Sequence, residues 1–431
     1  MNLDIISRVR ARGKEVFYGW WVVAAGAFIN AFGVGTFFYG FSTFFNPMVE
    51  EFGWSRTVMS GAFSLSRTEG GIAGPLNGWL TDKFGARKMV FIGVTVAGAG
   101  FMMLWLVNSP LSLYLIFGLF LSMGFNLGFM HATSAAVAKW FIKKRSRALS
   151  FLITGNGVGG AIFVPLIAWL IIEFGWRWAA VTIGLSMWVF VLPLGLIIRS
   201  TPEEMGLVPD GQPDRHKNLS PDVEHTSTEA SDSGTPFEEV DFGVREALKT
   251  RAFWIYAGSM MLRACILSSI VIHQIPHLTD IGITYQNASN VLGQMVLMSI
   301  PGRFLFGWLG DRFNKKVLLF LLCLLQGVGI FIFIHANTVA LLWLFVTIYG
   351  LSYGGVIPLT VALRADLFGR RNYATIAGIT MPLTMVGTVT APLFAGYLYD
   401  TAQSYDLAFY VFIVMIILSG ILFLFIPRTS R

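Results

Sequence analysis

The sequence predicts an all-α integral membrane protein with twelve transmembrane helices in two pseudo-symmetric six-helix bundles. Hydrophobic residues make up 55% of the chain and charged residues 13%, whereas soluble domains carry about 25% charged residues. Apolar runs long enough to cross a hydrocarbon core of ~30 Å recur along nearly the whole chain. These runs must be helical, because the bilayer core offers the backbone no hydrogen-bond partners. The 46 glycines are typical of membrane helices that pack closely.

The apolar runs fall into two sets of six separated by a polar segment. This segment, 200–251, is rich in Pro and Ser, holds 12 of the 24 acids and is interpreted as a disordered linker ending in a short surface helix at 242–251. The predicted order is therefore an N-terminal segment 1–17, a bundle 18–199, the linker, a bundle 252–426 and a C-terminal segment 427–431. The predicted spans are 18–45, 57–80, 89–107, 111–138, 148–172, 176–199, 252–278, 286–308, 317–335, 339–364, 372–399 and 405–426.

Basic residues in the short loops predict the orientation. Loops on one side carry most of them, and the opposite side keeps only Arg56 and Arg177. By the positive-inside rule, both termini are cytoplasmic in a multi-pass protein of the cell membrane, and the short outer loops favour a bacterial inner membrane. The first apolar run is too long for a signal-peptide core and is interpreted as a retained span. The basic loop residues are Lys83, Arg87, Lys88, Lys139, Lys143, Lys144, Arg145, Arg147, Arg312, Lys315, Lys316, Arg370 and Arg371.

One short motif occurs at the end of the second span and again at the end of the eighth. The first copy runs from Gly78 to Lys88 and the second from Gly307 to Lys316. The first copy resembles the signature G-x-x-x-D-[RK]-x-G-x-[RK]-[RK] of the major facilitator superfamily, and this resemblance implies two parallel halves around a central site. The second copy departs from the signature, because Asn314 replaces a glycine. The matching residues are Gly78, Asp82, Lys83, Gly85, Arg87 and Lys88, with Gly307, Asp311 and Arg312 in the second copy.

A narrower resemblance is to the monocarboxylate porters and the oxalate:formate antiporters. It is carried by the stretch from Tyr18 to Trp21, by the stretch from Phe52 to Arg56, and by Arg303 four residues before Gly307. The resemblance implies that Arg303 pairs with a substrate carboxylate. Tyr39 stands where many animal members carry a lysine, and Ser299 stands where they carry an acid. A coupling mechanism built on that acid therefore does not transfer.

Four charged residues are expected inside spans: Arg67, Glu69, Arg263 and Arg303. A charge at mid-membrane costs at least about 2.5–3.5 kcal/mol, so such residues are functional candidates. A guanidinium suits a carboxylate, and Arg303 and Arg263 are assigned to substrate binding. Arg67 is assigned, with Glu69, to proton coupling or an ion pair. The structural alternatives are snorkelling for Arg303 and an ion pair with Glu69 for Arg263.

Glu69 and Arg67 do not share a helix face, because they are two residues apart. Glu69 is predicted to carry a coupling proton or to compete with the substrate for an arginine, and a permanent structural pair is the alternative. Asn126 and His131 in the fourth span, with Tyr39, complete the predicted substrate site, although a histidine there can be simply hydrogen-bonded to its neighbours. His273 and His277 flank Pro276, where a kink is expected, and are predicted to be interfacial.

The repeated motif is predicted to act mechanically. Gly78 allows close helix approach, and Asp82, just beyond the second span, meets a helix N-terminus or loop cations. These contacts would close the inner side and break when it opens, and the structural alternative is a role in topology and folding. The sequence Gly155–Gly160 contains G-x-G-x-x-G, but it lies in an apolar helix, so close packing explains it better than a dinucleotide site.

These patterns favour a secondary transporter for a small organic anion, a mono- or dicarboxylate, which is expected to work as a monomer by alternating access, through proton symport or anion exchange. No catalytic constellation, cofactor motif, metal cluster or disulfide framework is found, and no nucleic-acid partner is expected. The solute, the coupling proton or counter-anion and the lipid bilayer are the expected partners. The alternatives are a carrier of neutral solutes or a drug exporter and, from another class, a transporter-like membrane sensor or interaction protein.

Overall fold

The computed structural model describes residues 17–141, 144–211, 243–368 and 373–427, and every regular element in these ranges is helical. Nine helical stretches of this part are long and apolar enough to cross a membrane. One of them, Arg147–Leu194, contains two spans, because the chain breaks at Gly175 with φ 80° and ψ 159°. The helices α4 (Arg56–Phe84) and α13 (Tyr285–Gly310) bring the total to the expected twelve.

The first span is longer than predicted. It comprises α2 (Tyr18–Gly33), a π-helical turn η1 (Val34–Tyr39) and α3 (Phe41–Phe52), so the predicted end at 45 was wrong. The polar side chains after Phe45 lower the hydropathy without breaking the helix. The helix ends where Gly53 adopts φ 66°, a left-handed conformation that favours glycine.

The remaining elements follow the predicted order. The expected surface helix before the seventh span is present as α11 (Val244–Lys249). Linker residues 212–242 lie outside the described residues, as do Lys143, Arg370 and Arg371. The other helices of the first half are α5 (Ala86–Met103), η2 (Leu104–Leu106), α6 (Pro110–Leu113), η3 (Tyr114–Leu121), α7 (Ser122–Gly128), α8 (Met130–Trp140), α9 (Arg145–Ser186), η4 (Met187–Val191) and α10 (Leu192–Leu194), followed by the short turns η5 (Pro202–Met205) and η6 (Pro209–Gly211). Those of the second half are α12 (Arg251–Asp280), α14 (Lys315–Ile334), α15 (Val339–Phe368), α16 (Tyr373–Ala402) and α17 (Asp406–Leu424).

The glycines of α9 bring three helices together, as predicted. A Cβ on Gly155 or Gly159 would collide with the backbone of α2, at Ala27 and Ala31. A Cβ on Gly157 would lie 2.9 Å from Ile300 of α13. The G-x-G-x-x-G sequence is therefore a two-sided packing motif that joins α9 to its own bundle and to the opposite one.

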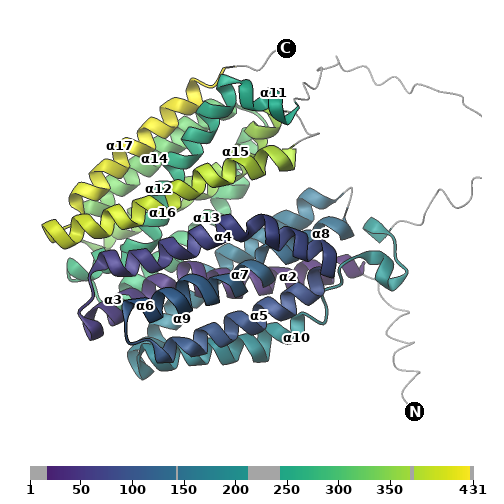
Figure 1. The fold of residues 1–431 in the computed structure, drawn as a ribbon. Coiled ribbons are helices and arrows are strands. Elements are labelled where there is room, and N and C mark those ends of the chain that lie inside the picture. The colour runs from purple at the N-terminus through teal and green to yellow at the C-terminus, as the bar shows by residue number, and fades with distance from the viewer. Residues whose placement is uncertain (1–16, 142–143, 212–242, 369–372, 428–431) are drawn as a thin grey trace, which may run out of the picture.

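The two bundles lie against each other at one end of the molecule and diverge toward the other (Figure 1). They meet near α3, which contacts α12, and separate toward α8 and α11. We call the first end the Arg56 face, where α4 begins, and the second end the basic face, where α4 ends and α14 begins at Lys315. Hydrogen bonds join the halves at the Arg56 face and in the middle of the molecule, as described next.

Candidate functional site

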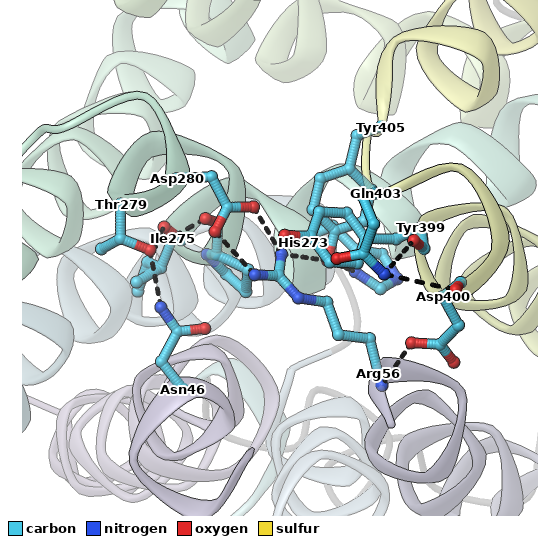
Figure 2. Close-up of polar contacts among 11 residues, drawn as sticks. Asn46, Arg56, His273, Ile275, Thr279, Asp280, Tyr399, Asp400, Gln403 and Tyr405 are labelled. Carbon is cyan, nitrogen blue, oxygen red and sulfur yellow. Dashed lines mark hydrogen bonds and ion pairs between the residues drawn. The ribbon is translucent and has the colours of Figure 1, made fainter. Parts of the chain in front are cut away.

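A polar network joins the two halves at the Arg56 face, and Arg56 lies at its centre (Figure 2). The guanidinium donates to both carboxylate oxygens of Asp280, at 2.6 and 2.7 Å, and to the hydroxyl of Tyr405 at 2.8 Å. It also lies 3.5 Å from the ring centroid of Tyr399. Arg56 belongs to the first half and its three partners to the second. One buried side chain thus connects α4 with the ends of α12, α16 and α17.

The backbone of α4 contributes to the same network. The amides of Arg56 and Thr57 donate to Asp400 at 2.9 and 3.0 Å, so this carboxylate caps the N-terminus of α4 from the opposite half. Asn46 donates to Thr279 at 2.6 Å, which adds a contact between α3 and α12. These contacts close the Arg56 face, and we call this set the Arg56 network.

His273 and His277 lie inside the protein, so the prediction of an interfacial position was wrong. The exposed fraction of His273 is 0% and that of His277 is 4%. The Nδ1 of His273 is 3.0 Å from the hydroxyl of Tyr405, and its Nε2 is 3.1 Å from the carbonyl of Pro392 and 3.3 Å from the hydroxyl of Ser60. The helix continues through Pro276 to Asp280. Pro276 has no amide hydrogen for the carbonyl of Ile272, and the hydroxyl of Ser42 in the opposite half donates to this carbonyl instead, at 2.8 Å.

The predictions overlooked the Arg56 network as a functional unit. Arg56 was used only as a cation of the outer loops and as part of the stretch that carries the family resemblance, and Asp280 and Asp400 were not considered. A usable signal was present, because Asp280 and Asp400 end spans seven and eleven on the side where Arg56 begins span two. Which acid meets Arg56 depends on helix packing and cannot be read from the spacing.

At mid-membrane the halves meet through tyrosines. The hydroxyls of Tyr39 and Tyr353 are 3.1 Å apart, joining η1 to α15. Tyr349 lies one turn before Tyr353 on α15. The contact therefore joins the halves through Tyr39, one of the predicted substrate residues.

Neither Arg303 nor Arg263 makes an ion pair with another described residue. The guanidinium of Arg303 donates to the carbonyl of Ile153 at 3.2 Å and to the hydroxyl of Ser299 at 3.4 Å. The guanidinium of Arg303 thus reaches across to α9 of the opposite half, instead of extending toward the membrane surface as a snorkelling side chain would. In both arginines Nε is buried without a hydrogen-bond partner. The alternative pair of Arg263 with Glu69 is not formed, because Glu69 has other partners.

Glu69 accepts hydrogen bonds from two neutral donors on α7. Its carboxylate lies 2.7 Å from the hydroxyl of Ser122 and 2.6 Å from the amide nitrogen of Asn126. Asn126 was predicted to bind substrate, and in this structure it holds Glu69. Arg67 points elsewhere, as its spacing implies, and lies 4.8 to 5.3 Å from the ring centroids of three phenylalanines, Phe37, Phe38 and Phe63. His131, also predicted at the site, is exposed near the start of α8.

The repeated motif lies at the basic face. The helix α4 runs to Phe84, so Asp82 belongs to its last turn. Gly85 ends this helix with φ 86°, a conformation that favours glycine. The amide of Arg87 is 3.4 Å from the hydroxyl of Ser200. Open space surrounds Gly78, so the close approach predicted there is not made in this conformation.

The charged ends of the two copies lie at the surface. Lys83 is exposed and lies 4.6 Å from the ring centroid of Trp79, and Lys88 is exposed. In the second copy, Arg312 stacks 3.9 Å from the ring centroid of Trp308, and Asp311 is exposed. A Cβ on Gly307 would make only ordinary contact with Pro358. Gly78 and Gly307 are therefore free of tight contacts while the Arg56 face is closed.

Comparisons with known proteins agree with this architecture. A family model described as Major Facilitator Superfamily matches residues 23–380 and again 267–431. Monocarboxylate transporter 12 of Mus musculus is 26% identical over 437 residues, covering 96% of this chain and 86% of that protein. Monocarboxylate transporter 13 of Rattus norvegicus is 26% identical over 397 residues, covering 91% of this chain and 85% of that protein. A crystal structure of a bacterial homologue of the human lysosomal transporter Spinster, inward-facing and unoccupied, has a similar fold, with a TM-score of 0.71 at 15% sequence identity. The match covers 95% of this chain and 97% of that chain.

Proposed function

The chain belongs to the Major Facilitator Superfamily, and from that premise we propose that it is a secondary transporter of a small mono- or dicarboxylate. It works by alternating access, as a proton symporter or an anion exchanger. The relatives named monocarboxylate transporters support the substrate class, as do the charges at mid-membrane. The basic face is the cytoplasmic one, in keeping with the excess of Lys and Arg in its loops.

The observation that carries this proposal is the pair of arginines without carboxylate partners. Arg303 and Arg263 each have a buried Nε that lacks a hydrogen-bond acceptor, and a charged group in the membrane interior is costly unless it is paired. A solute carboxylate would supply the missing charge and, with Arg303, would match the planar guanidinium through two parallel hydrogen bonds. We assign the hydroxyls of Tyr39 and Tyr353, which lie 3.1 Å apart on η1 and α15, as further polar contacts of the solute.

Glu69 is the group we assign to proton coupling. Its partners Ser122 and Asn126 are neutral, so its charge is not cancelled by an ion pair with either of them. A proton can therefore bind or leave without breaking a salt bridge between described residues. In the exchanger alternative, Glu69 stays ionised and competes with the substrate for an arginine.

The conformation supports access from the basic face. The Arg56 network closes the opposite face through Arg56, Asp280 and Asp400, and the bundles diverge toward the basic face (Figure 1). In this state, a solute would reach or leave the site at the two arginines from the basic face. Opening to the other side requires the Arg56 network to separate.

Uptake into proteoliposomes tests the proposal. A panel of radiolabelled carboxylates is compared with and without a proton gradient, for the wild type, Arg303→Gln, and Arg245→Gln as a surface control on α11. We expect uptake of at least one acid by the wild type and the control, and a loss of at least tenfold in Arg303→Gln, since one lost charge-assisted contact is worth about 1.5–3 kcal/mol. Absence of carboxylate uptake, or uptake indifferent to Arg303, would favour a neutral solute or an exporter.

A further inference from the structure

A cavity of about 200 Å³ indents the surface of the second half, between the beginnings of α13 and α15. Three carboxamides line it, those of Asn287, Asn290 and Gln294, and none of the described residues that line it is charged. The cavity lies at the Arg56 face, because α12 ends there at Asp280 and α13 follows directly. None of its lining residues belongs to the site described above.

The three carboxamides follow one face of α13, since positions three or four residues apart share a helix face. Leu297 and Leu305 continue this face and are exposed, as expected where a membrane helix meets lipid. Asn287 and Gln294 are two helical turns apart, about 10 Å along the axis, at the end of the helix. The polar part of this face therefore lies at the depth of the lipid head groups and esters, and its apolar part at the depth of the acyl chains.

The hydrogen bonds of Asn290 show which atoms the cavity offers. The Nε2 of Gln286 is 3.2 Å from the carbonyl of Pro165, which can only accept, and 3.2 Å from the Oδ1 of Asn290. Gln286 therefore donates to both, and the Nδ2 of Asn290 remains as a donor. The side chains of Asn287 and Gln294 make no hydrogen bond with another described residue. The cavity thus presents a row of neutral N–H donors.

We propose that this cavity binds a glycerophospholipid of the leaflet at the Arg56 face, through hydrogen bonds from the carboxamides to its phosphate and ester oxygens. A polar group that meets hydrocarbon without a partner is costly, and these oxygens are acceptors at the right depth. Because the lining is uncharged, it recognises the oxygens that all glycerophospholipids share and not the net charge of the head group. The inference does not depend on which solute is transported.

The apolar part of the lining suits the remainder of a lipid. Val291, Leu342 and Val346 are 9%, 5% and 1% exposed and form a closed apolar wall. Trp343, also in the lining, is 47% exposed, and tryptophans are enriched where membrane proteins meet the lipid interface. The cavity has room for about six water molecules at ~30 Å³ each, whereas a helix of a second copy, about 10 Å across, cannot enter it. The shape therefore favours a lipid over a protein partner.

Photo-crosslinking locates the lipid. Purified full-length protein in detergent receives a trace of phosphatidylcholine with a diazirine beside the glycerol, and the labelled peptides are identified by mass spectrometry. We expect label in peptides that contain residues 287–294 and 339–346. Asn287→Leu with Gln294→Leu should lower it about tenfold, since two hydrogen bonds are lost, while the link from Gln286 to α9 stays intact. Asn108→Leu is the matched control, because Asn108 is an exposed carboxamide of the same face outside the cavity.

A second variant and competing lipids complete the test. Val291→Phe fills the cavity and keeps every carboxamide, so it should also lower the labelling, and it decides the matter if the double variant folds poorly. Unlabelled phosphatidylcholine and phosphatidylglycerol should compete equally. Labelling in Val291→Phe equal to that of the wild type would overturn the proposal, as would competition by phosphatidylglycerol alone or by water-soluble glycerophosphocholine as strongly as by the intact lipid. A dimer in native mass spectra that the double variant loses would assign the cavity to a second copy and overturn it too.

Discussion

Removing the charge of Asp280 should open the Arg56 face. Arg56 donates two hydrogen bonds to Asp280, at 2.6 and 2.7 Å, with side chains 10% and 30% exposed. Hydrogen bonds to charged groups contribute about 1.5–3 kcal/mol, and the exposed part of Asp280 weakens the pair toward the lower end of this range. In Asp280→Asn one carbonyl acceptor remains, and Arg56 keeps Tyr405 and Tyr399. We therefore expect a net loss of about 2 kcal/mol, which corresponds to roughly a 30-fold shift of the equilibrium toward the state open at the Arg56 face.

Cysteine labelling measures this shift. Ser42 is 1% exposed and donates to the carbonyl of Ile272 across the halves at 2.8 Å, on the Arg56 side of the tyrosines. A single cysteine at this position, in a background with Cys265 and Cys323 replaced by alanine, reacts with a maleimide only when the Arg56 face opens. We expect labelling in nanodiscs to accelerate about 10- to 30-fold in Asp280→Asn, following the shift in population.

A matched control lies on the same face. Glu51 pairs with Arg177 at 2.5 Å, but both residues belong to the first half. The change Glu51→Gln therefore removes an ion pair of the same face without separating the bundles, and labelling at position 42 should stay at the wild-type rate. Equal labelling rates in Asp280→Asn and Glu51→Gln would refute the assignment of the Arg56 network as a gate.

Two further predictions concern coupling and packing. Glu69→Gln keeps an acceptor for Ser122 and removes the charge. Uptake should therefore lose its stimulation by an inward proton gradient while exchange persists. An unchanged pH dependence of uptake would contradict the coupling role. Gly159→Val should lower the thermal unfolding temperature in detergent, because its Cβ collides with the carbonyl of Ala31 and overpacking costs about 1–3 kcal/mol. Gly258→Ala is the control, since no atom lies within 4 Å of the added Cβ. Equal destabilisation of the two variants would show that the seam between α2 and α9 is not tight.

The fold class could be predicted because the bilayer imposes it locally. Each span must satisfy its own backbone hydrogen bonds, so length and hydropathy reveal its existence without reference to the rest of the chain. The predicted ends were less accurate where capping, not hydropathy, decides the boundary. The first span passes 45 to reach Phe52 because Gly53, with φ 66°, is the residue that ends the helix.

Candidate charges were also visible in the sequence, since a charge inside an apolar run is costly wherever it lies. The partners of these charged side chains could not be identified from the sequence. Glu69 meets Ser122 and Asn126, and Arg67 lies against aromatic rings, because the packing of α4 against α7 and η1 brings these side chains together. The alternative pair of Glu69 with Arg263 is not formed, because the carboxylate of Glu69 meets the two donors on α7 instead.

By itself, the sequence determined that this protein has twelve membrane helices in two related halves, with few charges inside them and a basic face. These properties follow from local physics, namely hydropathy, helix geometry and the position of cations in loops. Only the tertiary structure decided that Arg56, Asp280 and Asp400 close one face and that Tyr39 meets Tyr353 at mid-membrane. Those contacts join residues more than 200 positions apart, and their pairing depends on how whole helices pack, which no local pattern encodes.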